Sequence, residues 1–418
     1  MRFIFALFLS LCISQVFASK LLIPMDEEQK NHLKAYGIAY WTLQGEVDLE
    51  WLLNYRGGSF LIPFSEKIQR ECTIRGVSFQ VISDGQAVQI YNEIASPDVN
   101  MEVIKLEKVP KIAVYSPQGK QPWDDAVTLV LTYAEIPYDI IYDTEVIEGV
   151  LPLYDWLHLH HEDFTGQFGK FYASYRTAAW YQDEVKTNTN TAKALGFSKV
   201  SDLKGAVAQE IKKYVAGGGF LFTMCSGTDS YDIALAAQNV DICESMYDGD
   251  PAEANYQQKL EFSKALAFEN FTLVPDPLKY EFSNIDATDD HVRLGQTRDV
   301  FTLFDFSAKW DVVPTMLTQC HKRVVPGFMG QTTAFRKDLI KANVTVLGET
   351  KSIQSAKYIH GELGKGQWTF YGGHDPEDYR HLVGDPPTDL NLHPNSAGYR
   401  LILNNVLFPA AKKKKLKT

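Results

Sequence analysis

The 418-residue chain is poor in cysteine and in basic charge, and after its first twenty residues it has no long apolar run. Five cysteines in a chain of this length exclude a disulfide scaffold, and no two of them have the CxxC spacing of a metal or redox motif. Acidic residues outnumber basic ones by 52 to 41, which argues against a nucleic-acid partner because phosphate contacts need clustered Lys and Arg. The composition, 45% hydrophobic and 22% charged, is otherwise that of a globular protein.

The N-terminus has the pattern of a secretory signal. Arg2 precedes an almost entirely apolar run from Phe3 to Phe17, and Ala18 is a small residue of the kind found at cleavage sites. The run is shorter than a comfortable membrane span. We therefore predict a signal peptide at residues 1–19, a secreted or periplasmic mature protein, and no membrane span after cleavage. At the other end, residues 411–418 are predicted to be a solvated basic tail.

Short apolar runs alternate with longer helical stretches along most of the chain, which predicts an α/β protein. A smaller N-terminal α/β unit is expected over residues 20–107. Its expected strands are 20–25, 47–53 and 77–82, and its expected helices are 27–43 and 66–75.

A second α/β unit is predicted over residues 108–410. Strand–helix–strand units of this kind form a parallel sheet with helices on both faces, and sites form beyond the carboxyl ends of its strands. The pattern breaks at about residues 240–355, which we interpret as a large insertion. The expected strands are 111–115, 138–142, 153–159 and 220–224, with a closing hairpin at 356–371 and helices at 123–134, 203–216, 232–238 and 396–407.

The segment around Cys225 is the strongest candidate for a site. A glycine-rich stretch leads into the apolar run Phe220–Met224, then Cys225, then the polar turn Ser226–Ser230. A strand, a tight turn and a helix in this order form a nucleophile elbow, in which a helix N-terminus and a nearby imidazole lower the pKa of a thiol. His374, at a later predicted strand end, is the expected partner. The alternative is an inert core cysteine, since cysteine is among the most buried residue types.

Four stretches carry a family resemblance. The stretch Gly217–Cys225, followed by His374, resembles the class I glutamine amidotransferase-like fold, and Gly364–Glu377 is similar to the closing strand of trehalose-utilisation (ThuA-like) proteins. Residues 31–41 and 51–60 resemble a secreted bacterial family that carries the label asparagine synthetase B. The resemblance implies a parallel flavodoxin-like sheet over residues 108–235 and 356–410, with Cys225 as nucleophile.

The sequence departs from the amidotransferase pattern in two places. In that family the catalytic histidine and glutamate are two residues apart, whereas His374 and Glu377 are three apart, so either Asp375 or Glu377 could orient the imidazole. Met224 replaces the glycine before the cysteine, while Gly227 keeps the one after it.

The asparagine synthetase label implies ATP chemistry, and Ser226–Ser230 is similar to the pyrophosphate loop of ATP pyrophosphatases. It lacks that loop's second glycine, and the expected mature N-terminus has no cysteine to act as the glutaminase nucleophile. Asparagine synthetase activity is therefore disfavoured.

A histidine-rich segment ends the predicted strand 153–159. It contains His158, His160 and His161, followed by Glu162. The fold resemblance implies that this loop faces the elbow, so we assign His160, His161 and Glu162 to substrate contact, together with Ser226, Gly227 and Thr228 of the elbow. We assign no metal ligand and expect no cofactor. Metal-dependent hydrolysis by the histidines with His374 remains an alternative.

These patterns predict a secreted Cys-His hydrolase that acts on an amide or related acyl bond of a small molecule, glycan or peptide. Cys225 would attack, His374 would act as base and then as acid, and Asp375 or Glu377 would orient it. A non-catalytic binding module for a glycan or an envelope partner is the competing hypothesis, because this fold also occurs without a working triad.

Overall fold

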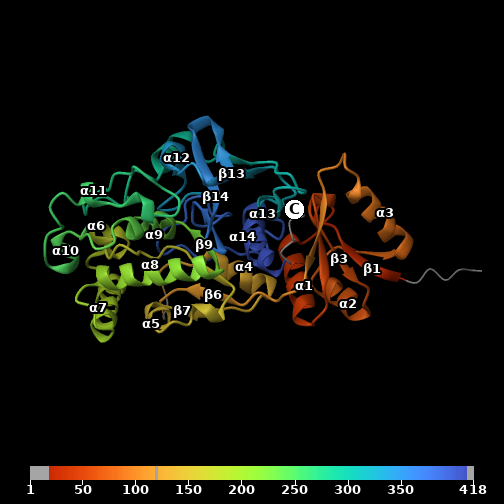
Figure 1. Ribbon diagram of the computed structural model, residues 1–418, viewed down its shortest axis with the longest axis horizontal. Coiled ribbons are helices and arrows are strands. Elements are labelled where there is room, and N and C mark those ends of the chain that lie inside the picture. Colours follow the sequence, from red (N-terminus) through yellow and green to blue (C-terminus); the bar gives the residue numbers. More distant parts are fainter. Residues whose placement is uncertain (1–17, 118–120, 412–418) are drawn as a thin grey trace, which may run out of the picture.

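The computed structural model describes residues 18–117 and 121–411 (Figure 1). The expected signal peptide, apart from Ala18 and Ser19, and the basic run Lys412–Lys415 lie outside the described residues. The described chain is a mixed α/β protein with two sheets, which confirms the predicted fold class at that level. Within the described ranges, no helix is long and apolar enough to cross a membrane.

The smaller sheet is antiparallel and has the strand order β4-β1-β3-β2-β5. The sequence predicted three of these strands and two helices, but it did not predict β3, β5 or α3. Helix α3 begins where Ser83 and Gln86 cap each other's backbone in a capping box. The elements are β1 (Ala18–Ile23), α1 (His32–Gln44), β2 (Leu49–Leu53), β3 (Ser59–Pro63), α2 (Glu66–Ile74), β4 (Gln80–Ser83), α3 (Asp84–Ala95) and β5 (Glu102–Leu106).

The larger sheet has the order β11-β10-β13-β14-β15-β9-β8-β6-β7, and β12 pairs with β14. From β15 to β7 all neighbours are parallel, and from β11 to β15 they are antiparallel. The antiparallel pair β14–β15 confirms the predicted closing hairpin. The strands are β6 (Ile112–Tyr115), β7 (Asp139–Ile141), β8 (Trp156–Leu159), β9 (Phe220–Met224), β10 (Val300–Leu303), β11 (Val324–Pro326), β12 (Phe335–Arg336), β13 (Thr345–Thr350), β14 (Ser355–Leu363) and β15 (Gly366–Tyr371).

The segment 240–355 contributes strands to this sheet as well as short helices. Strands β10, β11 and β13 extend the sheet beyond β14 by antiparallel pairing. The helices of the segment are α10 (Ser245–Asp248), α11 (Tyr256–Lys259), α12 (Thr288–Leu294) and α13 (Val312–Leu317).

Helices cover both faces of the parallel strands, and side chains alternate between two cores with the strand period of two. Trp156, Phe222 and Met224 join one apolar core with α1, α4 and α14, while Leu157 and Leu221 join the other with α8 and α9. Helix α1 of the smaller unit packs on α4 and α14, so the two sheets share a core (Figure 1). The remaining helices are α4 (Ala126–Ala134), α5 (Asp143–Ile147), α6 (Tyr172–Tyr175), α7 (Ala179–Ala194), α8 (Val200–Gly217), α9 (Ser226–Ala236) and α14 (Ala397–Leu407).

Candidate functional site

Cys225 occupies a strained turn between β9 and α9. Its backbone has φ 50° and ψ −140°, a conformation that non-glycine residues rarely adopt and that clusters at functional sites. Helix α9 begins at Ser226, six residues earlier than the sequence predicted, so the segment Ser226–Ser230 is the first turn of a helix and is buried. Strand, turn and helix therefore have the order of a nucleophile elbow.

Gly227 lets this elbow approach the end of β8. Its N–H donates to the carbonyl oxygen of His160 at 2.7 Å, and a Cβ at this position would lie only 2.3 Å from the same oxygen. Thr228 stabilises the turn, because its hydroxyl donates to the carbonyl oxygen of Cys225 at 2.6 Å. Ser226, Gly227 and Thr228, predicted to bind substrate, thus shape the elbow.

The Cys225 sulfur is enclosed, with the residue 2% exposed. Burial raises the pKa of the thiol, while hydrogen bonds from the backbone of Thr332, Ser226 and Gln331 favour the thiolate. Gly330 packs against the sulfur: a Cβ there would lie 2.9 Å from Sγ and 2.8 Å from the backbone nitrogen of His374. The residues around Gly330 therefore close one side of the elbow.

His374 lies beyond the end of β15, which is adjacent and parallel to β9. Its Nε2 donates to the carbonyl oxygen of Asp124 at 3.0 Å, because a carbonyl can only accept. Burial, and then the imidazoles of His160, His161 and His381, hold the pKa of His374 well below its usual range. The ring is therefore neutral, with its lone pair on Nδ1.

Asp375 and Glu377, the predicted orienting groups, have other partners. The Asp375 carboxylate is buried and accepts from the Glu377 N–H at 2.8 Å, and the Glu377 carboxylate lies 3.0 Å from Nδ1 of His393. The group that orients His374 is the backbone carbonyl of Asp124, which the sequence analysis did not single out.

Asp125 organises the histidine-rich end of β8. One carboxylate oxygen caps α4 by accepting from the N–H groups of Val127 and Thr128, and the other lies 3.1 Å from Nε2 of His158 and 3.2 Å from Nδ1 of His160. Burial alone would raise the pKa of Asp125, but the two histidines hold it well below its usual range. A half-buried carboxylate thus lies against both rings.

Glu162, the carboxylate assigned to substrate contact, belongs to a separate buried network. Its pKa is raised to about 8 by burial, and its Oε2 accepts from the Tyr142 hydroxyl at 3.3 Å. The same network contains Lys204, which pairs with the fully buried Asp143 at 2.9 Å. Glu162 thus lies among interior groups, whereas His160 and His161 meet His374.

Cys225, His161 and His374 line one cleft of about 360 Å³. The sequence analysis missed most of the other residues that line this cleft. Trp123 could have been found, because it follows β6 and sites form beyond the carboxyl ends of parallel strands. A larger cleft of about 690 Å³ beside α8 and α9 is lined by neither cysteine nor histidine. The smaller cleft is lined by Trp123, His161, Phe171, Ser174, Tyr175, Cys225, Tyr280, Met329, Gly330, Gln331, His374, Arg380, His381, Leu382 and Val383.

Comparisons with known proteins give no assignment. No protein-family model and no curated protein matches the chain. Among solved structures, two cytoplasmic proteins of Salmonella typhimurium align over their whole length with 73% and 72% of this chain, at 11% and 14% identity and TM-scores of 0.36 and 0.37. A β-galactosidase from Bacillus circulans sp. alkalophilus matches with 29% of its length, 64% of this chain, 12% identity and a TM-score of 0.24.

Proposed function

We propose that this protein is a cysteine-dependent hydrolase that acts on an amide or related acyl bond. The observation that carries the proposal is the strained Cys225 elbow, which opens into a cleft shared with His374. We also propose the finer fold class expected from the sequence, the class I glutamine amidotransferase type. The run of parallel strands β15-β9-β8-β6-β7 and the elbow after β9 support it.

The arrangement suits a thioester mechanism. His374, held by the Asp124 carbonyl, would accept the thiol proton on Nδ1 while Cys225 Sγ attacks the acyl carbon. The protonated imidazole would return that proton to the departing amine as the carbon–nitrogen bond breaks. Water would then hydrolyse the thioester, with His374 again taking and returning a proton.

Backbone amides are available for the oxyanion of each tetrahedral intermediate. The N–H groups of Ser226, Gln331 and Thr332 already face the sulfur, and amides aimed at a developing charge lower the barrier by about 3–4 kcal/mol each. The N–H of Gly227 has no such role, because it donates to the carbonyl of His160.

The cleft walls indicate the kind of substrate. Trp123 stacks on Phe171, with ring centroids 5.2 Å apart, and Tyr175 and Tyr280 add further aromatic surface. Arg380 is exposed at the cleft and adds a positive charge. Aromatic faces bind flat or CH-rich groups, so a small molecule, a glycan or a peptide fits this lining.

One observation favours the competing function, a non-catalytic binding module. Cys225 is only 2% exposed, and burial raises the pKa of its thiol. A reactive cysteine usually has a partly exposed, positively polarised environment. In this alternative the aromatic cleft binds its ligand and Cys225 is part of the packing.

Covalent trapping separates the two functions. The full chain is treated at neutral pH with a panel of p-nitroanilides and p-nitrophenyl esters, then quenched in acid, and its peptides are weighed by mass spectrometry. The hydrolase predicts an acyl group on Cys225, absent from Cys225→Ala and retained in Cys243→Ala, a control at another buried cysteine.

Iodoacetamide labelling provides a second measurement that needs no substrate. We expect Cys225 to react faster than the more exposed Cys320, and His374→Ala to remove that advantage. Labelling of Cys225 no faster than Cys320, together with no acyl adduct, would leave only the binding module.

A further inference from the structure

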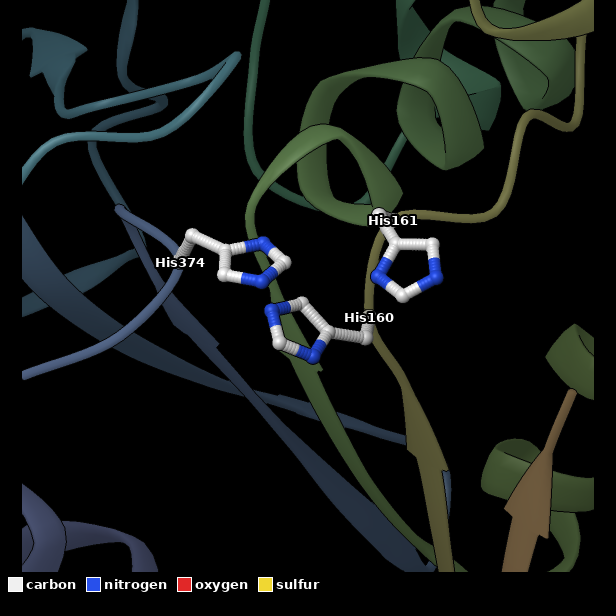
Figure 2. Close-up of side chains that lie close together, drawn as sticks. All are labelled: His160, His161 and His374. Atoms are coloured by element: carbon white, nitrogen blue, oxygen red, sulfur yellow. The ribbon is translucent and has the colours of Figure 1, made fainter. Parts of the chain in front are cut away.

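Three imidazoles converge at the floor of the cleft. His160 and His161 directly follow β8 and His374 follows β15, and Figure 2 shows their rings gathered together. Ring centroids are 4.4 Å apart for His160 and His374, 4.9 Å for His160 and His161, and 5.7 Å for His161 and His374. One nitrogen from each ring lies within 4.8 Å of the other two.

The groups behind two of these rings are those that support metal-binding histidines. Nδ1 of His160 lies 3.2 Å from the Asp125 carboxylate, and Nε2 of His374 donates to the carbonyl of Asp124. A ligating histidine in proteins almost always has its second nitrogen bonded to a carboxylate or a backbone carbonyl, which fixes the tautomer and raises the basicity of the first.

On His160 and His161, the nitrogens that remain are buried without a hydrogen-bond partner. Neither nitrogen of His160, a residue 1% exposed, has a hydrogen bond, although its Nδ1 lies 3.2 Å from the Asp125 carboxylate. Nδ1 of His161 has none either. Leaving a buried polar atom unpaired is costly, so such atoms call for a specific explanation. A cation shared by the three rings would satisfy them together.

We infer that His160, His161 and His374 bind one divalent transition-metal ion of the zinc class, with its remaining position open to the cleft. Three neutral imidazoles are a ligand set that zinc and its neighbours favour, and a three-histidine site leaves a position for water or another ligand. The inference does not depend on the proposed hydrolase, and it adds a consequence for it. A metal on His374 occupies the imidazole that would serve as base, so the ion would slow acylation of Cys225.

Trp123 competes with the metal for His161. The indole N–H contacts Nε2 of His161, and since an indole can only donate, that nitrogen is an acceptor and the ring proton resides on Nδ1. Coordination through Nδ1 moves the proton to Nε2, where it would face the indole N–H. The indole must therefore turn away when the metal binds, and removing its N–H should favour binding.

The test uses the full chain freed of metal with a chelator and titrated with Co²⁺, whose visible absorption reports ligand number and geometry. We expect one ion per chain, displaced by Zn²⁺, with binding lost in His161→Ala and His374→Ala and retained in His393→Ala, a histidine outside the cluster. Asp125→Asn should weaken binding roughly 10–100-fold. Trp123→Phe should tighten it roughly fivefold, a gain that misfolding cannot produce.

Several outcomes would overturn the inference. These are no cobalt absorption, binding that survives in the two cluster variants, or a Trp123→Phe variant that binds no more tightly than the parent chain. The result is separable from the proposed function. Cobalt binding, with no Cys225 adduct even in the metal-free chain, refutes the hydrolase and supports the metal site. A Cys225 adduct in the metal-free chain, with no cobalt binding, supports the hydrolase and refutes the metal site.

Discussion

Substituting Gly227 by alanine tests whether close packing of the elbow on β8 builds the site. An added methyl carbon would lie 2.3 Å from the carbonyl oxygen of His160, about 1 Å inside ordinary contact. Relieving this overlap moves the start of α9 away from β8 and stretches the 2.7 Å bond from the Gly227 N–H to His160. Overpacking costs about 1–3 kcal/mol and the hydrogen bond about 0.5–1.5 kcal/mol, so we expect a loss of about 2–4 kcal/mol.

The functional effect should be of the same order as the effect on stability. Cys225 precedes the moving helix while His160 directly follows β8, and a displacement of about 1 Å in a reacting geometry can cost roughly 100-fold in rate. Stability is measured by urea denaturation followed by circular dichroism, and rate by iodoacetamide labelling of Cys225.

The matched control is Gly205→Ala, inside helix α8, where a Cβ meets nothing within 4 Å. It should stabilise the chain by roughly 0.5–1 kcal/mol, because alanine restricts the unfolded backbone and favours the helix. Equal stability of the two variants, with Cys225 labelling unchanged in both, would refute the packing argument.

Three further predictions concern buried ionisable groups. Burial raises the pKa of Asp229 to about 8, above its usual 3.8, so the stability that its protonated carboxyl contributes is complete below about pH 4 and is lost as pH rises to 8. Measured by urea denaturation, the free energy of unfolding of Asp229→Asn should rise relative to that of the parent by about 1.4 kcal/mol per pH unit between pH 5 and 7. A difference that does not change with pH would contradict this. Lys204→Met strands the buried carboxylate of Asp143 and should cost about 3–5 kcal/mol, most of it recovered when Asp143→Asn is added, as a double-mutant denaturation cycle will measure. Arg400→Lys should lower the free energy of unfolding by about 2–4 kcal/mol, since one ammonium cannot reproduce the buried guanidinium's separate hydrogen bonds to the backbone carbonyls of Met25 and Gly57; a melting temperature equal to the parent's would count against that role.

Local pattern was sufficient for elements whose signal is short-range. The strand Phe220–Met224 was predicted at its observed bounds, because a continuous apolar run between glycines and a polar turn is typical of a buried parallel strand. The hairpin of β14 and β15 followed from two apolar runs separated by a glycine turn. Strand β3 was missed because it follows the Asn54–Gly58 turn without an amphipathic alternation, its side chains being buried on both faces except at Pro63.

The candidate site was predictable only in part. That Cys225, His160 and His374 should gather at one edge of the sheet follows from their places after successive parallel strands. The roles of Asp375 and Glu377 did not follow, because a carboxylate two or three residues from a histidine can point to either side of a turn. Asp124 supplies the orienting carbonyl instead, from a loop 250 residues away in the chain.

The sequence by itself determined the alternation of strands and helices, and with it the edge of the sheet where reactive side chains accumulate, because these depend on residues a few positions apart. The tertiary structure alone decided which nitrogen of each histidine faces a backbone carbonyl, a carboxylate or an indole N–H, and which is left for a proton or a metal. It also decided that residues 329–331 close over Cys225. Such choices are made by hydrogen bonds and packing between distant segments, and those contacts exist only once the two cores have formed around the sheet.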